Sequence, residues 1–113
     1  MLTDNLFNLP SLPLSEELVT ILIENEAVRI ERIVSTGQVS DWYDQDENEF
    51  VALLQGEAEI TWVDGTTTKL MAGDTLMIPQ HKRHWVSYTS SKPPCIWLCV
   101  FWGGVVEFSI YIH

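Results

Sequence analysis

The stretch that decides the fold runs Glu49-Phe-Val-Ala-Leu-Leu-Gln-Gly56, then Asp64-Gly65, then Gly73-Asp-Thr-Leu-Met-Ile-Pro79, then His81-Lys-Arg-His84. Its short apolar runs end at a glycine or a proline, which is typical of buried strands. An Asp-Gly pair between two alternating runs is a strong signal for a β-hairpin. The stretch therefore predicts several short antiparallel strands that follow one another closely.

Alternating apolar and polar residues predict further strands on either side of this stretch. In residues 27–34, Val28 and Ile30 fall on one face and Arg29 and Glu31 on the other, which is typical of a half-buried strand. The same alternation predicts a strand at 57–63 with Ala58, Ile60 and Trp62 facing inward, and a strand at 83–89 with His84, Val86 and Tyr88 on one face. A continuous apolar run predicts a strand covered on both sides at 95–102. A chain of about eight to ten short strands with turns between them favours an all-β sandwich or barrel.

The two ends of the chain are expected to differ from this pattern. Residues 1–14 contain two prolines and predict an extended arm that packs its leucines and Phe7 against the barrel or against a second copy. Ser15-Glu16-Glu17 is typical of a helix start, and Leu18, Ile21 and Leu22 follow at helical spacing, so we expect a short helix, although the β-branched residues here also suit a strand. We divide the chain into an arm and helix at 1–27, a barrel at 28–102 and a last strand of the same domain at 103–113.

The charge of the chain limits its partners. The 113 residues carry a net charge of −10 with only six lysines and arginines, so no basic surface is available to neutralise a row of nucleic-acid phosphates. An anionic membrane would repel the chain for the same reason, and no apolar run approaches the length of a membrane span. We therefore expect neither nucleic-acid nor membrane binding.

The two cysteines indicate a reducing compartment. Cys95 and Cys99 lie four residues apart on a predicted strand, so they point to the same face but stand too far apart to form a disulfide easily. Buried free thiols are typical of the cytoplasm. The first residues lack the basic and apolar regions of a signal peptide, which also favours a cytoplasmic location.

Two spaced motifs carry a family resemblance. In the first, Gly37 is followed after five residues by Tyr43-Asp-Gln45, then after three by Glu49, then after six by Gly56. In the second, Gly73 is followed after five residues by Pro79-Gln-His81, then after two by His84, then after three by Tyr88. The chain resembles the small bacterial single-domain cupins, whose two motifs have these spacings, roughly from Val28 to Trp102. The resemblance implies a jelly-roll barrel, also called a double-stranded β-helix.

This chain departs from the family pattern at several motif positions. Tyr43 and Gln45 replace two histidines, His81 replaces a turn glycine and Tyr88 replaces an asparagine, while Glu49 and His84 are retained. If the first motif uses its alternative four-residue spacing, Trp42 and Asp44 stand at the histidine positions instead. Adjacent strand residues point to opposite faces, so either residues 42 and 44 or residues 43 and 45 face the barrel. We expect His81 to be an exposed turn residue.

The resemblance implies a site inside the barrel around Glu49 and His84. Cupins bind a divalent metal such as iron, manganese, nickel or zinc through three histidines and a glutamate, and the candidates for metal ligands here are Glu49, His84, Gln45 and Asp44. Three or four such ligands are the usual number for a metal of this kind. The residues that we expect to contact a small-molecule ligand are Tyr43, Gln45, Glu49, His84 and Tyr88.

Three functions fit these residues. The first is the binding of a small molecule, through a divalent metal or without one. The second is a metal-dependent enzyme of the dioxygenase or isomerase type, in which a metal-bound water or oxygen does the chemistry. The third is a structural or regulatory protein whose pocket is vestigial. In each case we expect a homodimer, because the apolar arm, the apolar last strand and an open sheet edge give a reason to associate.

Overall fold

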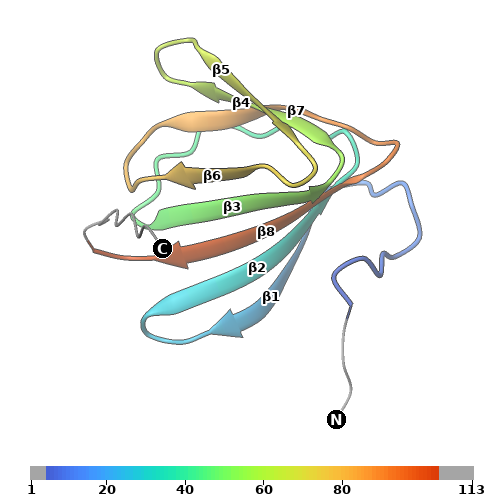
Figure 1. Ribbon diagram of the computed structural model, residues 1–113, viewed down its shortest axis with the longest axis horizontal. Helices are drawn as coiled ribbons and strands as arrows, with labels where there is room; N and C mark the ends of the chain where they lie inside the picture. The colour runs from blue at the N-terminus through green and yellow to red at the C-terminus, as the bar shows by residue number, and fades with distance from the viewer. Residues whose placement is uncertain (1–4, 105–113) are drawn as a thin grey trace, which may run out of the picture.

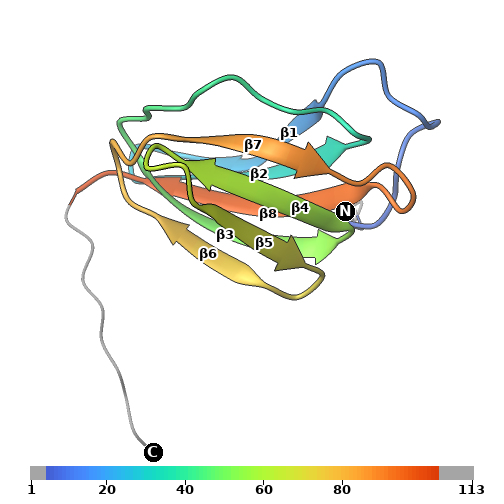
Figure 2. The ribbon, with the colours of Figure 1, turned by 90° about the horizontal axis from the view of Figure 1, so that it is seen from above.

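The computed structural model describes residues 5–104 and consists of two antiparallel sheets. The five-stranded sheet has the order β1-β2-β8-β3-β6 and the three-stranded sheet has the order β5-β4-β7. The smaller sheet lies over the larger one (Figures 1 and 2). The strand bounds are β1 Leu18–Glu24, β2 Val28–Ser35, β3 Asn48–Gln55, β4 Glu57–Trp62, β5 Thr67–Met71, β6 Thr75–Ile78, β7 His84–Thr89 and β8 Cys95–Trp102.

The core lies between the two sheets. Leu53 and Trp97 from the larger sheet meet Ile60 and Leu70 from the smaller one in a single buried cluster. The residues at β4 positions predicted to face inward, Ala58, Ile60 and Trp62, are all buried. The predicted all-β jelly-roll barrel is thus confirmed.

The predicted N-terminal helix is wrong. Residues Leu18–Glu24 form strand β1, which pairs antiparallel with β2 from Leu18 opposite Val34 to Glu24 opposite Arg29. Without β1, the edge of β2 would leave a row of unpaired backbone groups. The β-branched residues of this segment suit a strand that can satisfy those groups, so the tertiary pairing overrides the weak helical spacing.

The five-stranded sheet has a charged inner face and an apolar outer face along β2. Register pairs place Arg29, Phe101, Glu49 and Ile78 in one row across four strands, and this row faces the smaller sheet. The next row is Ile23, Ile30, Val100, Phe50 and Met77, with one residue from each of the five strands. Because side chains alternate along a strand, this second row lies on the outer face. The sequence grouped Val28 with Ile30 and Arg29 with Glu31 correctly, and it is the charged pair that turns inward.

The N-terminal arm is held to the barrel mainly by polar contacts. The Arg32 guanidinium donates hydrogen bonds to the backbone oxygens of Leu6 and Asn8, at 3.3 and 2.6 Å. Phe7 and Leu12 remain exposed, so the predicted apolar packing of the arm is only partly present in a single chain.

The predicted strand at 103–113 falls almost wholly outside the described residues. No helix in the described part of the chain has the length and apolar character needed to cross a membrane.

Candidate functional site

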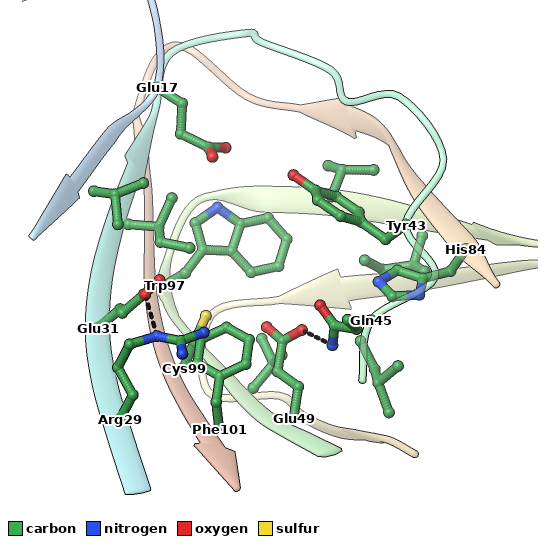
Figure 3. A pocket seen from close by; sticks show the side chains of 16 residues that line it. Glu17, Arg29, Glu31, Tyr43, Gln45, Glu49, His84, Trp97, Cys99 and Phe101 are labelled. Atoms are coloured by element: carbon green, nitrogen blue, oxygen red, sulfur yellow. Dashed lines mark hydrogen bonds and ion pairs between the residues drawn. The ribbon is translucent and has the colours of Figure 1, made fainter. Parts of the chain in front are cut away.

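A cavity of about 250 Å³ opens between the two sheets. Its wall combines apolar side chains with a cluster of ionisable ones (Figure 3). The lining residues come from the end of the arm, from the loop before β3 and from seven strands: Glu17, Val19, Arg29, Glu31, Ile33, Tyr43, Gln45, Glu49, Val51, Ile60, Ile78, His84, Val86, Trp97, Cys99 and Phe101. Buried ionisable groups in a cavity make this the candidate functional site.

Glu49 is the most enclosed carboxyl of the cavity. Its position on the inner face of β3 leaves the residue only 8% exposed, and its Oε1 accepts a hydrogen bond from Gln45 Nε2 at 3.0 Å. Burial raises the pKa of Glu49, while hydrogen bonds from Gln45 and the Cys99 thiol oppose that rise. Burial and the neighbouring Glu49 charge raise the pKa of Cys99 well above its ordinary value. Cys99 is therefore a protonated thiol that donates to Glu49, and not a thiolate nucleophile.

His84 presents an unprotonated ring nitrogen. The residue is 2% exposed at the start of β7, and its Nδ1 lies 2.8 Å from the Lys82 backbone oxygen. A carbonyl oxygen only accepts, so Nδ1 carries the proton and Nε2 keeps its lone pair. Burial lowers the pKa of His84, with a contribution from the Lys82 charge, against the opposing hydrogen bond to the Lys82 carbonyl. The imidazole is accordingly neutral at pH 7, and among residues 5–104 Nε2 has no hydrogen-bond partner.

The loop before β3 decides which residues enter the cavity. Tyr43 forms a backbone bridge with His84, and its ring lies 5.4 Å from the imidazole, centroid to centroid. Tyr43 and Gln45 line the cavity, with Tyr43 still 39% exposed at its mouth. The alternative pair turns away from the cavity, because Trp42 contacts Trp85 and Asp44 contacts His81.

His81 fixes this orientation from outside the cavity. Its backbone N–H donates to the Gln45 carbonyl at 2.8 Å, and its Nδ1 lies 2.9 Å from Asp44 Oδ1. His81 is exposed, as predicted, and its φ of 63° is a left-handed conformation that explains why the family pattern has a glycine here.

Tyr88 does not reach the cavity. The pairing of β7 with β4 shifts between Glu59, which faces Tyr88, and Ile60, which faces Val86. Ser87 is the extra residue of this bulge, and a bulge breaks the alternation of side chains. Val86 therefore points inward with His84, as expected, whereas Tyr88 is 47% exposed on the other side.

The sequence reading missed the ionisable groups on the opposite wall. Arg29 and Glu31 come from the inner face of β2, and Glu17 comes from the segment before β1. Burial raises the pKa of Glu17. A hydrogen bond from the Ser35 hydroxyl opposes this rise, and the charge of Glu31 adds to it. The alternation of β2 placed Arg29 and Glu31 together on one face, and this was the signal that pointed to them. Nothing in the sequence indicated that this face was the inner one.

The proposed metal ligands do not form a metal site that fits a transition metal. Asp44 lies outside the cavity, which leaves Glu49, His84 and Gln45. Gln45 turns its amide N–H toward the Glu49 carboxylate, which directs its carbonyl oxygen away from that carboxylate, so the two do not converge on one ion (Figure 3). Within the described residues, no group of three or more His, Cys, Asp or Glu side chains is arranged to hold a metal ion. Two ligands are too few for such an ion.

The sequence identifies the class of protein. Residues 31–101 match the family described as the cupin domain. The match covers more than half of the chain, and the chain belongs to the cupin family. A search of curated proteins found no match.

Solved structures agree with this assignment. A protein from Ralstonia eutropha JMP134, provisionally named a mannose-6-phosphate isomerase, is 33% identical, with 90% of this chain and 98% of that chain covered at a TM-score of 0.85. A cupin superfamily protein from Desulfitobacterium hafniense DCB-2 is 23% identical, with 84% of each chain covered and a TM-score of 0.73. The cupin domain of Schizosaccharomyces pombe Cnp3 is 16% identical, with 87% of this chain and 68% of that chain covered and a TM-score of 0.71. The last two show the fold alone.

The site combines Glu49 and His84, whose pKa values are shifted toward each other. Burial makes Glu49 a weaker acid and His84 a weaker base than usual. Pairs of this kind can hold a proton on a bound molecule or accept one from it. The cavity thus presents hydrogen-bonding side chains beside apolar walls.

Proposed function

We propose that this cupin binds a small organic molecule in the cavity, with Glu49, His84, Gln45 and Tyr43 as its polar contacts and without a bridging transition metal. The observation that carries the proposal is the convergence of a buried carboxyl and a neutral imidazole in a cavity with apolar walls. A few polar groups placed in an apolar concavity are the usual design of ligand sites. The volume of about 250 Å³ lies just below the common range, which favours a ligand smaller than most drugs.

We do not propose for this chain the isomerase activity that the name of the Ralstonia protein gives. A sugar phosphate is an anion and needs free cationic groups or a metal to hold it. In this chain Arg29 is the one arginine or lysine among the cavity-lining residues, and two glutamates already bind it. The donor set around Glu49 likewise offers a metal too few ligands.

A ligand screen by thermal unfolding tests this function. The library contains neutral, anionic and cationic compounds with up to about 12 non-hydrogen atoms. A ligand at 100 times its Kd adds about 2.7 kcal/mol, which in a domain of this size raises Tm by roughly 10 °C. Substitution of Val86→Trp narrows the cavity and is expected to abolish the shift, whereas the exposed Val63→Trp control retains it. If no compound in the library shifts Tm, or if Val86→Trp leaves every shift unchanged, the cavity is not a binding site.

We also propose that the protein is a homodimer whose copies meet through the outer row of Ile23, Ile30, Val100, Phe50 and Met77. Ile23 and Phe50 are 52% and 38% exposed, and the row carries no charge. The net charge of −10 opposes the approach of two copies elsewhere on the surface, so an uncharged, self-complementary patch is the favoured place for contact. A cytoplasmic location stays a prediction.

A further inference from the structure

The cavity carries an excess of negative charge. Three of its lining residues are glutamates, namely Glu17, Glu31 and Glu49, against one arginine, Arg29. These carboxyls come from three different parts of the fold and point toward one space (Figure 3). Like charges gathered in a low-dielectric space raise the free energy of the empty site, and a ligand of opposite charge relieves that repulsion.

Arg29 offsets only part of this charge, because it pairs with Glu31, and each of its three nitrogens already contacts a carboxylate. Its Nε lies 2.7 Å from Glu31 Oε2. Its Nη1 and Nη2 donate to the two carboxylate oxygens of Glu47 at 3.0 and 2.8 Å. The face of the guanidinium lies 4.4 Å from the centre of the Phe101 ring. An anionic ligand would have to compete with these two ion pairs, and the bidentate one with Glu47 is of a kind that is among the stronger polar contacts in proteins.

Gln45 and His84 add hydrogen-bond acceptors to the cavity. Gln45 points its amide N–H at Glu49, so its carbonyl oxygen stays available. His84 offers the lone pair of Nε2, because its proton is on Nδ1. The indole N–H of Trp97 donates to Ser35 Oγ at 3.2 Å and is not free for a ligand. A molecule that satisfies this site must bring several N–H or O–H donors of its own.

Aromatic rings complete the site. Tyr43 and Trp97 both line the cavity, and the Phe101 ring already holds one cation, Arg29. Aromatic faces attract cations, and they do so more strongly when the cation is desolvated. The combination of carboxylates, lone-pair acceptors and aromatic walls is therefore matched to a positively charged donor with an apolar body.

We propose that the ligand of this cavity is a small organic cation, a primary amine or a guanidinium compound with an aliphatic or aromatic body, held by Glu49 and Glu17 and by His84 Nε2. This inference rests on the proposed function, since it names the class of molecule that the same cavity takes. A cationic ligand distinguishes this cavity from one that binds sugar phosphates or carboxylic acids.

Matched probes test the charge of the ligand directly. Benzylamine, benzyl alcohol and benzoate share a body and differ in charge, and agmatine adds a guanidinium compound with an aliphatic body. Isothermal titration calorimetry and thermal unfolding of the full chain are expected to show that benzylamine or agmatine binds at least about tenfold more tightly than the uncharged and anionic probes. Equal binding of the three benzyl compounds, or tighter binding of benzoate, would overturn the inference.

Two variants locate the interaction. Glu49→Gln keeps the shape of the side chain and removes its charge, so the affinity for the amine should fall by roughly 10- to 100-fold. Glu57→Gln makes the same change at an exposed position on β4 and should leave the affinity unchanged. Thermal unfolding of each variant checks that it is folded. An amine that binds Glu49→Gln as tightly as the unchanged protein would contradict the assignment.

Proton release provides a second readout. Burial raises the pKa of Glu17 and Glu49 in the empty site, and a bound cation favours their ionised forms, so amine binding should release protons and strengthen as the pH rises from 5 to 7. Calorimetry in two buffers of different ionisation enthalpy measures this release. The titratable or charged groups that face the cavity are Glu17, Arg29, Glu31, Tyr43, Glu49, His84 and Cys99. If the unchanged protein binds the amine without releasing protons, just as Glu49→Gln does, the role given to the carboxyls is wrong.

The screen and the probes fail in different ways. If neutral or anionic compounds bind in the cavity, with a shift that Val86→Trp abolishes, and the amines do not, the proposed function stands and the cation inference is wrong. If nothing in either set binds, both are wrong.

Discussion

Around the cavity, the inner and outer faces of the five-stranded sheet depart from the usual relation between polarity and burial. On the inner face, Arg29, Glu31 and Glu49 surround a cavity. On the outer face, Ile30, Val100 and Met77 are only half-buried, and Ile23 and Phe50 are exposed. Apolar surface left in contact with water is costly, and so are carboxyls removed from it.

The comparison shows that each face carries an energetic cost in a single chain without a ligand. Charged groups turned inward are costly unless a partner of opposite charge joins them, and apolar rows turned outward lose their cost when another surface covers them. These costs are the reason for our two proposals, that the inner face binds a ligand and that the outer face binds a partner chain.

The largest effect is expected from the core beside the cavity. Leu53→Ala removes a side chain that is 0% exposed on the inner face of β3, and such a change costs about 2–5 kcal/mol of unfolding free energy. Leu98→Ala makes the same change at a half-buried outer position of β8 and should cost about 1 kcal/mol in the monomer. Urea unfolding at low protein concentration measures both. Equal losses would mean that the outer face is packed as tightly as the inner one.

A charge on the outer row tests whether that face binds a second copy. Val100→Lys places an ammonium in the middle of the row, where burial against a partner would leave it unpaired. We expect the dimer Kd to rise at least about tenfold, the equivalent of 1.4 kcal/mol, as measured by sedimentation equilibrium. Val63→Lys, at an exposed residue next to the Asp64-Gly65 turn, is the matched control. An unchanged protein that is monomeric at all concentrations would exclude this role of the outer face.

The smallest effect concerns pH. Because burial raises the folded-state pKa of Glu49 above its ordinary value of 4.5, the folded chain holds this proton more tightly than the unfolded chain does. The contribution of Glu49 to stability therefore falls as the pH rises from 4.5 through the raised pKa. Glu49→Gln should stabilise the ligand-free protein at pH 7 by on the order of 1 kcal/mol and lose this advantage near pH 4. Thermal unfolding across this range measures the difference, and a gain that is the same at pH 4 and pH 7 would argue against a buried carboxyl.

The strands from β2 to β8 could be predicted because their alternation and turns are local signals. The Asp64-Gly65 turn and the buried residues Ala58, Ile60 and Trp62 followed directly from the sequence. The segment Leu18–Glu24 could not be decided, because its spacing suits a helix and its β-branched residues suit a strand. Pairing with β2, a contact made only in the folded chain, settles the choice.

The site could be predicted only where a residue sits on a regular strand. Glu49 and His84 enter the cavity as expected. Whether Tyr43 or Asp44 faces the cavity depends on a contact between Asp44 and His81. These two residues are 37 positions apart in the sequence. The bulge at Ser87 turns Tyr88 outward, and no sequence signal marks it. Alternation groups the residues of a strand into two faces, but it does not say which face is inside, and for this reason Arg29 and Glu31 were missed.

The most direct test of the account is to map where an organic cation binds. In ¹H–¹⁵N correlation spectra, saturating benzylamine should shift the amide signals of inner-face residues such as Glu49, Cys99 and His84, and leave those of Ile30 and Val100 nearly unchanged. Benzoate at the same concentration should shift neither set. Shifts confined to the outer row, or the same inner-face shifts with benzoate, would contradict the claim that the inner face is a site for a cation.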